Sequence, residues 1–267
     1  FYLKSKIKCI TNFYKDFYGA NNSISAFVGE LDKNTITGFL NKTFGTWDSK
    51  MKFTAIAPKH FDVKGGTEAI NTPDKTNAVV LGNININISE THKDYPALFM
   101  ANELLGGGAF LSSRIPMRLR ENEGMSYGAG TYMNSNYKYD VTNWGLYAFN
   151  PLYKGRLDSA MHQEIDKAIA AGFTKDELTK SVSAWIEGNK TSLGMNDFLA
   201  RQLRWYIRDG RDLTDFTNFE SRVKALTTDA VNAAMKKYFD KSKLVVVYGG
   251  EFDKTKPADK PAEKKGF

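Results

Sequence analysis

Hydrophobic residues recur at helical spacing from the start of the chain. The residues that form this stripe are Leu3, Ile7, Ile10, Phe13, Tyr14 and Phe17. Steps of three and four residues place them on one face of a helix. A turn at 19–22 is followed by Ile24, Ala26 and Val28, which we interpret as a strand, and then by a second apolar helix that reaches Phe44. The first part of the chain is therefore expected to be a helix, strand, helix unit.

The beginning of this unit is echoed near the other end of the chain. There Lys237-Tyr238-Phe239 precede a turn, a strand is expected at 244–248, and Gly250-Glu251-Phe252-Asp253 resemble Gly29-Glu30-Leu31-Asp32. A spacing on the order of 220 residues is too long for a solenoid, so a duplicated domain is the better interpretation, although a chance match of one helix and strand stays open. The expected organisation is the end of a preceding homologous domain at 1–50, a connector at 51–76, a complete C-terminal domain at 77–252 and a flexible tail at 253–267.

The C-terminal domain mixes strand and helix patterns. Ala78 to Leu81 are apolar, and the isoleucines at 84, 86 and 88 alternate with asparagines, as in a strand with one buried face. The other expected elements are a helix at 94–105, a short helix capped by Ser112 or Ser113 and reaching about 121, a hairpin of 126–133 with 141–149, helices at 157–172, 174–186, 197–208, 213–225 and 228–239, and the strand at 244–248. This order predicts an α+β fold with a mixed, largely antiparallel sheet and helices on one face.

Composition narrows the class of protein. With 42% hydrophobic residues and a mean hydropathy of -0.44, the 267-residue chain resembles an ordinary soluble globular protein. It contains no apolar run near the roughly 20 residues of a membrane span and no signal-peptide pattern, and the compartment is unknown. The net charge of +7 is scattered among acids, so nucleic-acid binding ranks last. Cys9, the single cysteine, excludes an internal disulfide and is expected to be buried.

Several common catalytic sites are not indicated. His60, His92 and His162 are far apart in sequence and form neither H-x-x-E-H nor H-E-x-x-H, so no metal is expected to bind to this chain. The serines that follow Gly106-Gly107-Gly108 lack the G-x-S-x-G order of a serine hydrolase, and the glycines lack the Lys-Ser or Lys-Thr of a phosphate-binding loop. Termination of a helix explains these glycines equally well.

The most informative stretch runs from Leu104 to Gly128. It reads Leu-Leu-Gly-Gly-Gly-Ala-Phe-Leu-Ser-Ser-Arg-Ile, and after three residues Leu-Arg-Glu-Asn-Glu-Gly-Met-Ser-Tyr-Gly. It resembles the C-terminal domains of the inverted-motif zinc peptidases, the family of pitrilysin, insulin-degrading enzyme and mitochondrial processing peptidase. Ile115 stands where leucine is commoner in that family. The stretch from Tyr18 to Asp32 is similar to the end of the family's preceding domain, so the resemblance covers most of the chain.

The resemblance implies a role in peptide hydrolysis. The family's zinc ligands and glutamate base belong to an N-terminal domain, so zinc is expected in the complete enzyme, supplied by a missing N-terminal half or a companion subunit, and this chain alone should be inactive. The positions that match the family's substrate-contacting arginine and tyrosine are Arg120 and Tyr127. Without the resemblance, the favoured interpretation is structural: Arg120 pairs with a nearby acid, and Tyr127 packs as an aromatic residue of a strand. Arg114 and Arg118 are weaker candidates that we do not expect to be catalytic.

The expected function is substrate binding within a zinc endopeptidase that acts on peptide or unfolded protein. An exposed strand edge can also pair with an extended peptide, and the strand at 84–88 or its neighbours is a candidate. The alternative is a non-catalytic family member that acts as a peptide-binding or assembly subunit. Physiological substrate and oligomeric state do not follow from the sequence.

Overall fold

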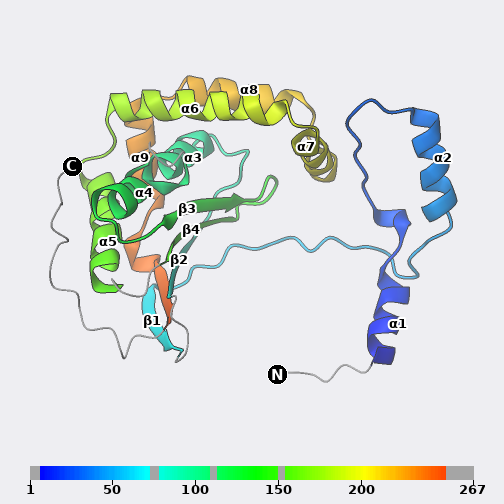
Figure 1. Ribbon diagram of the computed structural model, residues 1–267, viewed down its shortest axis with the longest axis horizontal. Coiled ribbons are helices and arrows are strands. Elements are labelled where there is room, and N and C mark those ends of the chain that lie inside the picture. Colours follow the sequence, from blue (N-terminus) through cyan, green and yellow to red (C-terminus); the bar gives the residue numbers. More distant parts are fainter. Residues whose placement is uncertain (1–6, 73–77, 109–112, 150–153, 251–267) are drawn as a thin grey trace. The chain divides into compact units, whose positions relative to one another are not determined.

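The computed structural model describes residues 7–72, 78–108, 113–149 and 154–250 (Figure 1). The contacts within the chain define two compact units. The first consists of Phe1–Ala57 and Asn189–Asp215, and the second of Pro58–Gly188 and Phe216–Phe267. The tail expected at 253–267 and the cap at Ser112 lie outside the described residues.

The first unit contains the helices α1 (Ile7–Phe17), α2 (Lys33–Phe44) and α7 (Asn196–Asp209), with a 3-10 turn η1 at Ala20–Asn22. The Asp32 side chain caps α2 by accepting a hydrogen bond from the Thr35 backbone N–H at 2.6 Å. Both N-terminal helices follow the sequence prediction.

Two predictions for this unit were wrong. Residues 24–28 do not form a strand, because a strand needs a neighbour for its backbone hydrogen bonds and the described residues of this unit include none. Cys9 is exposed, not buried, because α1 has no buried residue despite its apolar stripe.

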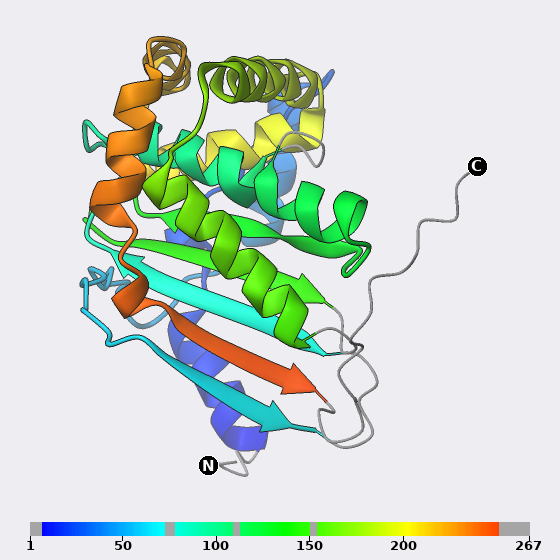
Figure 2. The same cartoon turned by 90° about the vertical axis from the view of Figure 1, so that its left-hand side faces the viewer.

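The described residues of the second unit form one sheet of five strands. They are β1 (Gly66–Asn71), β2 (Val79–Ile86), β3 (Gly128–Ser135), β4 (Thr142–Phe149) and β5 (Val245–Gly250), in the spatial order β1-β5-β2-β4-β3 (Figures 1 and 2). Among the described strands, β1 and β5 pair in parallel and the other pairs are antiparallel. The mixed, largely antiparallel sheet and the hairpin of β3 with β4 are therefore confirmed.

Helices cover one face of this sheet (Figure 2). Their bounds are α3 Tyr95–Asn102, π-helix η2 Glu103–Gly107, α4 Arg114–Pro116, π-helix η4 Met117–Asn122, α5 Lys154–Ala170, α6 Lys175–Leu193, α8 Thr214–Lys224, α9 Thr228–Tyr238 and 3-10 helix η5 Lys241–Lys243. The predicted capping box before α6 is present, since Thr174 Oγ1 accepts from the Glu177 N–H and Glu177 accepts from the Thr174 N–H. None of the helices among the described residues is both long and apolar enough to cross a membrane.

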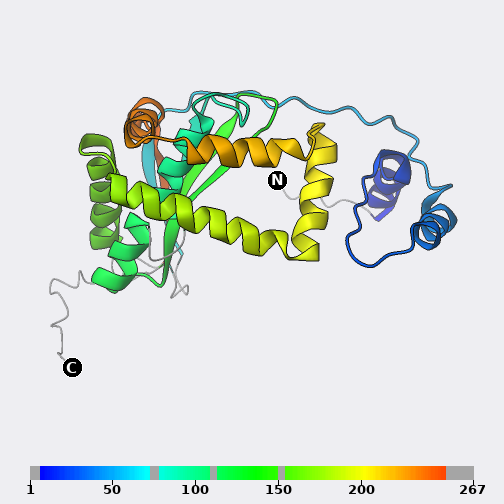
Figure 3. The ribbon, with the colours of Figure 1, turned by 90° about the horizontal axis from the view of Figure 1, so that it is seen from above.

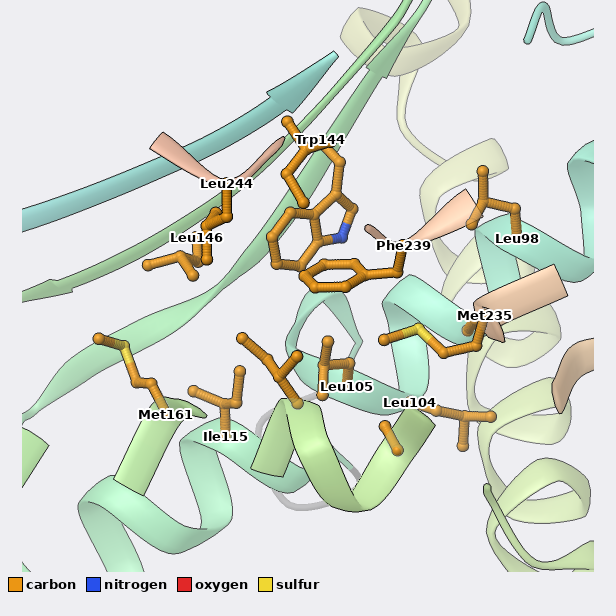
Figure 4. Packing of buried hydrophobic residues seen from close by; sticks show 14 of the residues in the cluster. Leu98, Leu104, Leu105, Ile115, Trp144, Leu146, Met161, Met235, Phe239 and Leu244 are labelled. Atoms are coloured by element: carbon orange, nitrogen blue, oxygen red, sulfur yellow. The ribbon is translucent and has the colours of Figure 1, made fainter. Parts of the chain in front are cut away.

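The core lies between the sheet and these helices. Alternate residues of β2 and β4, among them Ile84 and Trp144, point into it and are almost fully buried. The Trp144 ring meets Phe239, at the end of α9, edge to face with centroids 4.7 Å apart (Figure 4). Above α3, the helices α6 and α8 run in opposite directions (Figure 3). They contact each other through Trp185 and Phe219, whose ring centroids are 5.7 Å apart. In this unit the apolar periodicity of β2 and β4 thus corresponds to their buried faces.

The polar stretch before residue 77 contributes an edge strand. β1 lies inside the range expected to be a connector with short extended segments, and all of its residues are exposed, so it lacks the alternation that marks a strand. It pairs with β5, and β3 forms the opposite edge. The strand considered above at 84–88 for peptide pairing belongs largely to β2, which is central, between β5 and β4. The domain boundaries themselves remain predictions.

Candidate functional site

The segment from Arg120 to Tyr127 connects η4 to β3 and is anchored at both ends by buried side chains. Leu119 and Met125 are fully enclosed in the core. The backbone N–H of Met125 donates to the Leu119 carbonyl at 2.7 Å, which brings the two anchors together. The residues between them therefore form a compact loop on the surface.

Two local features shape this loop. Gly124 has a φ of +60°, a conformation that favours glycine, and its N–H donates to the Arg120 carbonyl at 3.2 Å. Ser126 is buried, and its Oγ lies 2.7 Å from the Phe149 carbonyl and accepts from the Phe149 N–H at 3.3 Å. Ser126 thus fastens the start of β3 to the end of β4. Sequence analysis missed this role because the bonds join residues 23 positions apart.

Arg120 reaches the surface from the first part of this loop, which belongs to η4, and Tyr127 reaches it two residues after Met125. The Arg120 side chain is 52% exposed, with Nε 3.7 Å from Oε1 of the adjacent Glu121. Tyr127 is 80% exposed and stacks on Phe149 with ring centroids 6.4 Å apart and planes at 22°. The two side chains thus have different neighbours, and both a guanidinium and a phenol are presented to solvent.

Arg114 and Arg118 lie in ion pairs instead. Arg114 makes a bidentate pair with Glu177, with Nε–Oε1 2.7 Å and Nη2–Oε2 2.9 Å, and also donates to the Gly172 carbonyl. Arg118 donates to Glu123 and Glu164, both at 2.8 Å. Burial by itself would lower the pKa of Arg118, but the two carboxylates outweigh burial and raise this pKa above its ordinary value.

An open cleft between η4 and α5 is lined by these same groups. Arg114, Arg118 and Lys167 supply positive charge, and each is paired with a carboxylate. The partners of the two arginines are given above, and Lys167 Nζ lies 2.8 Å from Glu164 Oε1. Binding of an anion here would compete with existing ion pairs. The charged groups that line the cleft therefore hold structural elements together, and their charges are already paired within the protein.

The glycine-rich turn of the motif allows close packing against β3. A Cβ on Gly106 would lie 2.8 Å from the Thr131 backbone nitrogen, and one on Gly107 would lie 2.8 Å from Oε1 of Glu103. Glu103 is partly buried beneath this turn. Burial raises its pKa to about 7, and a hydrogen bond from Asn102 Nδ2 at 3.3 Å offsets this only in part. The turn therefore does more than end a helix, because it lets the π-helix η2 approach the sheet.

The histidines do not provide a zinc site. His60 and His162 each contact one acid, Asp62 at 3.5 Å and Asp158 at 3.3 Å, while His92 accepts from a backbone N–H. Across the residues that the structure describes, no group of three His, Cys, Asp or Glu side chains is placed to hold a metal ion. This donor set does not fit the three protein ligands of a catalytic zinc.

Comparison with known proteins identifies the family. A family model described as the peptidase M16 inactive domain matches residues 8–184. The chain belongs to the peptidase M16 inactive-domain family. An uncharacterized zinc protease of Streptomyces coelicolor is 25% identical over 202 residues, which cover 70% of this chain and 41% of that protein. The family assignment confirms the resemblance read from the Leu104–Gly128 motif.

Solved structures of M16-type proteins share the fold. The crystal structure of a peptidase M16 inactive domain from Pseudomonas fluorescens superimposes with a TM-score of 0.74 at 20% identity, and covers 95% of this chain and 59% of that one. The crystal structure of a protease from Helicobacter pylori also gives 0.74, at 17% identity, over 92% of this chain and 59% of that one. The chain thus spans 41% of the Streptomyces relative and 59% of each of these two solved chains.

Proposed function

We propose that this chain is the C-terminal, substrate-contacting part of a zinc endopeptidase whose zinc site lies in an N-terminal half or a companion subunit. The observation that carries the proposal is the exposure of Arg120, near the end of η4, and of Tyr127, just before β3, in one short segment that buried residues hold in place. The same two positions match the family's arginine and tyrosine. In this proposal the zinc ligands belong to that half or subunit, which agrees with the absence of a three-donor group among the described residues of this chain.

Each side chain suits a step of peptide hydrolysis. The Arg120 guanidinium can donate to substrate carbonyl oxygens and so hold an extended peptide or unfolded protein in place. The Tyr127 hydroxyl can donate a hydrogen bond to the oxyanion that develops when the scissile carbonyl is attacked. Since loss of one such donor costs about 3 kcal/mol in the transition state, each side chain accounts for roughly 100-fold in rate.

Cleavage of a quenched, unstructured peptide library tests the proposal. The chain is assayed with zinc, alone and mixed with the zinc-bearing region or subunit, and activity is expected only in the mixture. Arg120→Ala and Tyr127→Phe should each lower kcat/KM about 100-fold. Arg201→Ala and Tyr139→Phe are matched controls, because these residues are also exposed but lie on α7 and in the β3–β4 turn.

The second candidate function is a non-catalytic binding or assembly subunit. It is favoured by the description of the matching family model as an inactive domain. A mixture that binds peptide or partner but does not cleave would support this candidate. Full activity of both the Arg120 and Tyr127 variants would count against the proposed contacts even if the mixture cleaves.

A further inference from the structure

The loop that presents Arg120 is tied to α5 by a carboxylate. Glu123 lies three residues after Arg120 and four before Tyr127. Its Oε1 accepts from Arg118 Nε at 2.8 Å, and its Oε2 lies 3.4 Å from Nη2 of Arg156, on α5. The Glu123 side chain is about one quarter exposed, so the contact is partly shielded from water. The loop is therefore fastened to the helical layer near its middle.

Arg118 is itself held in one orientation. Its Nη1 donates to Glu164 Oε1 at 2.8 Å and its Nη2 to Gln163 Oε1 at 2.6 Å, both on α5. Glu164 is only 6% exposed and also accepts from Lys167 Nζ at 2.8 Å. Because a buried carboxylate must keep its partners, the Arg118 guanidinium cannot turn freely, and its Nε remains directed at Glu123.

We propose that Glu123 is a positioning residue, which through Arg118 and Arg156 fixes where Arg120 meets the substrate. The inference rests on the function proposed above and adds a residue that the family motif did not indicate. Glu123 does not contact the peptide in this account. It acts through the location of the loop alone.

The backbone hydrogen bonds of this loop, among them the one from the Glu123 N–H to the Arg118 carbonyl at 3.0 Å, join the loop to η4 and not to α5. Leu119 and Met125 anchor its ends, but η4 ends at Asn122 and Gly124 has the left-handed φ of +60° that glycine adopts without strain. Without the attachment of Glu123, the residues between the anchors can shift relative to α5. A displacement of about 1 Å in a group that contacts the transition state costs on the order of 100-fold in rate.

The test is steady-state cleavage by the complete protease, with the zinc-bearing region present, at a temperature well below unfolding. Glu123→Ala is expected to lower kcat about 10- to 100-fold while KM changes less than about threefold, because the loop is displaced but the substrate surface is not removed. Glu123→Gln keeps an oxygen that accepts from Arg118 and should recover part of the loss. A purely stabilising role would lower the unfolding temperature without this split between kcat and KM.

The matched control is Glu177→Gln. It weakens an ion pair of similar length and exposure, Arg114–Glu177 at 2.7 Å, which joins α4 to the start of α6 and not to the loop. Its kcat should stay within about twofold of the parent. Unchanged kcat in Glu123→Ala, with Arg120→Ala and Tyr127→Phe impaired, would refute the positioning role alone. Unchanged kcat in all three would refute the proposed function as well.

Discussion

Glu103 provides a direct test of how burial acts on a charge in this fold. It begins the π-helix η2 and lies beneath the glycine turn, where its Oε1 is within 3.3 Å of Asn102 Nδ2. Burial raises its pKa from 4.5 to about 7. Replacement by glutamine keeps the shape of the side chain and a hydrogen-bond acceptor but removes the proton equilibrium.

The sign and size of the effect follow from that pKa. The folded state binds this proton more tightly than the unfolded state. The contribution of Glu103 to the free energy of unfolding is therefore greatest below pH 4.5 and falls as pH rises to about 7. A shift of roughly 2.5 units at about 1.36 kcal/mol per unit gives a loss of about 3 kcal/mol. Partial exposure of Glu103 to water makes this an upper bound. Glu103→Gln should therefore gain stability over the parent at pH 8 and little at pH 4.5.

The assay is denaturant unfolding at pH 4.5 and pH 8, followed by hydrogen-exchange mass spectrometry of peptides from β2 and β4. These strands belong to the unit that contains Glu103, so the signal excludes unfolding of the other unit. Glu68→Gln is the control, since Glu68 is exposed on the edge strand β1. If the parent and Glu103→Gln lose the same stability between the two pH values, the burial argument is refuted.

Two further predictions concern the same unit. Gly106→Ala should destabilise it by about 1–3 kcal/mol, because the new Cβ meets the Thr131 backbone nitrogen at 2.8 Å, and a lower denaturation midpoint of β3 and β4 would show this. Burial by itself would raise the pKa of Glu177, but hydrogen bonds from Arg114 and Thr174 outweigh it and lower the pKa to about 2. Stability from Glu177 is thus present above pH 4.5 and lost as pH falls towards 2, and Glu177→Gln should flatten this acid dependence in a pH titration of unfolding.

Short-range patterns in the sequence determined much of this fold. The alternation of Ile84 and Ile86 with asparagines, the glycines after Leu105 and the Thr174–Glu177 capping box each depend on a few neighbouring residues, and all correspond to elements of the structure. The α+β class followed from their order. The family motif indicated Arg120 and Tyr127 because their types and spacing are readable in one line of sequence.

Only the tertiary structure decided which of these residues have partners. The exposed strand β1 carries no apolar alternation and becomes visible only through its pairing with β5, while residues 24–28 carry the pattern and have no neighbouring strand. Glu164 lies on the apolar face of α5, and an acid in that position indicates that a cation must pair with it. Its partner Arg118, however, is 46 residues away in the sequence. Strand pairing and buried ion pairs depend on contacts between distant segments, and a single sequence does not specify those contacts.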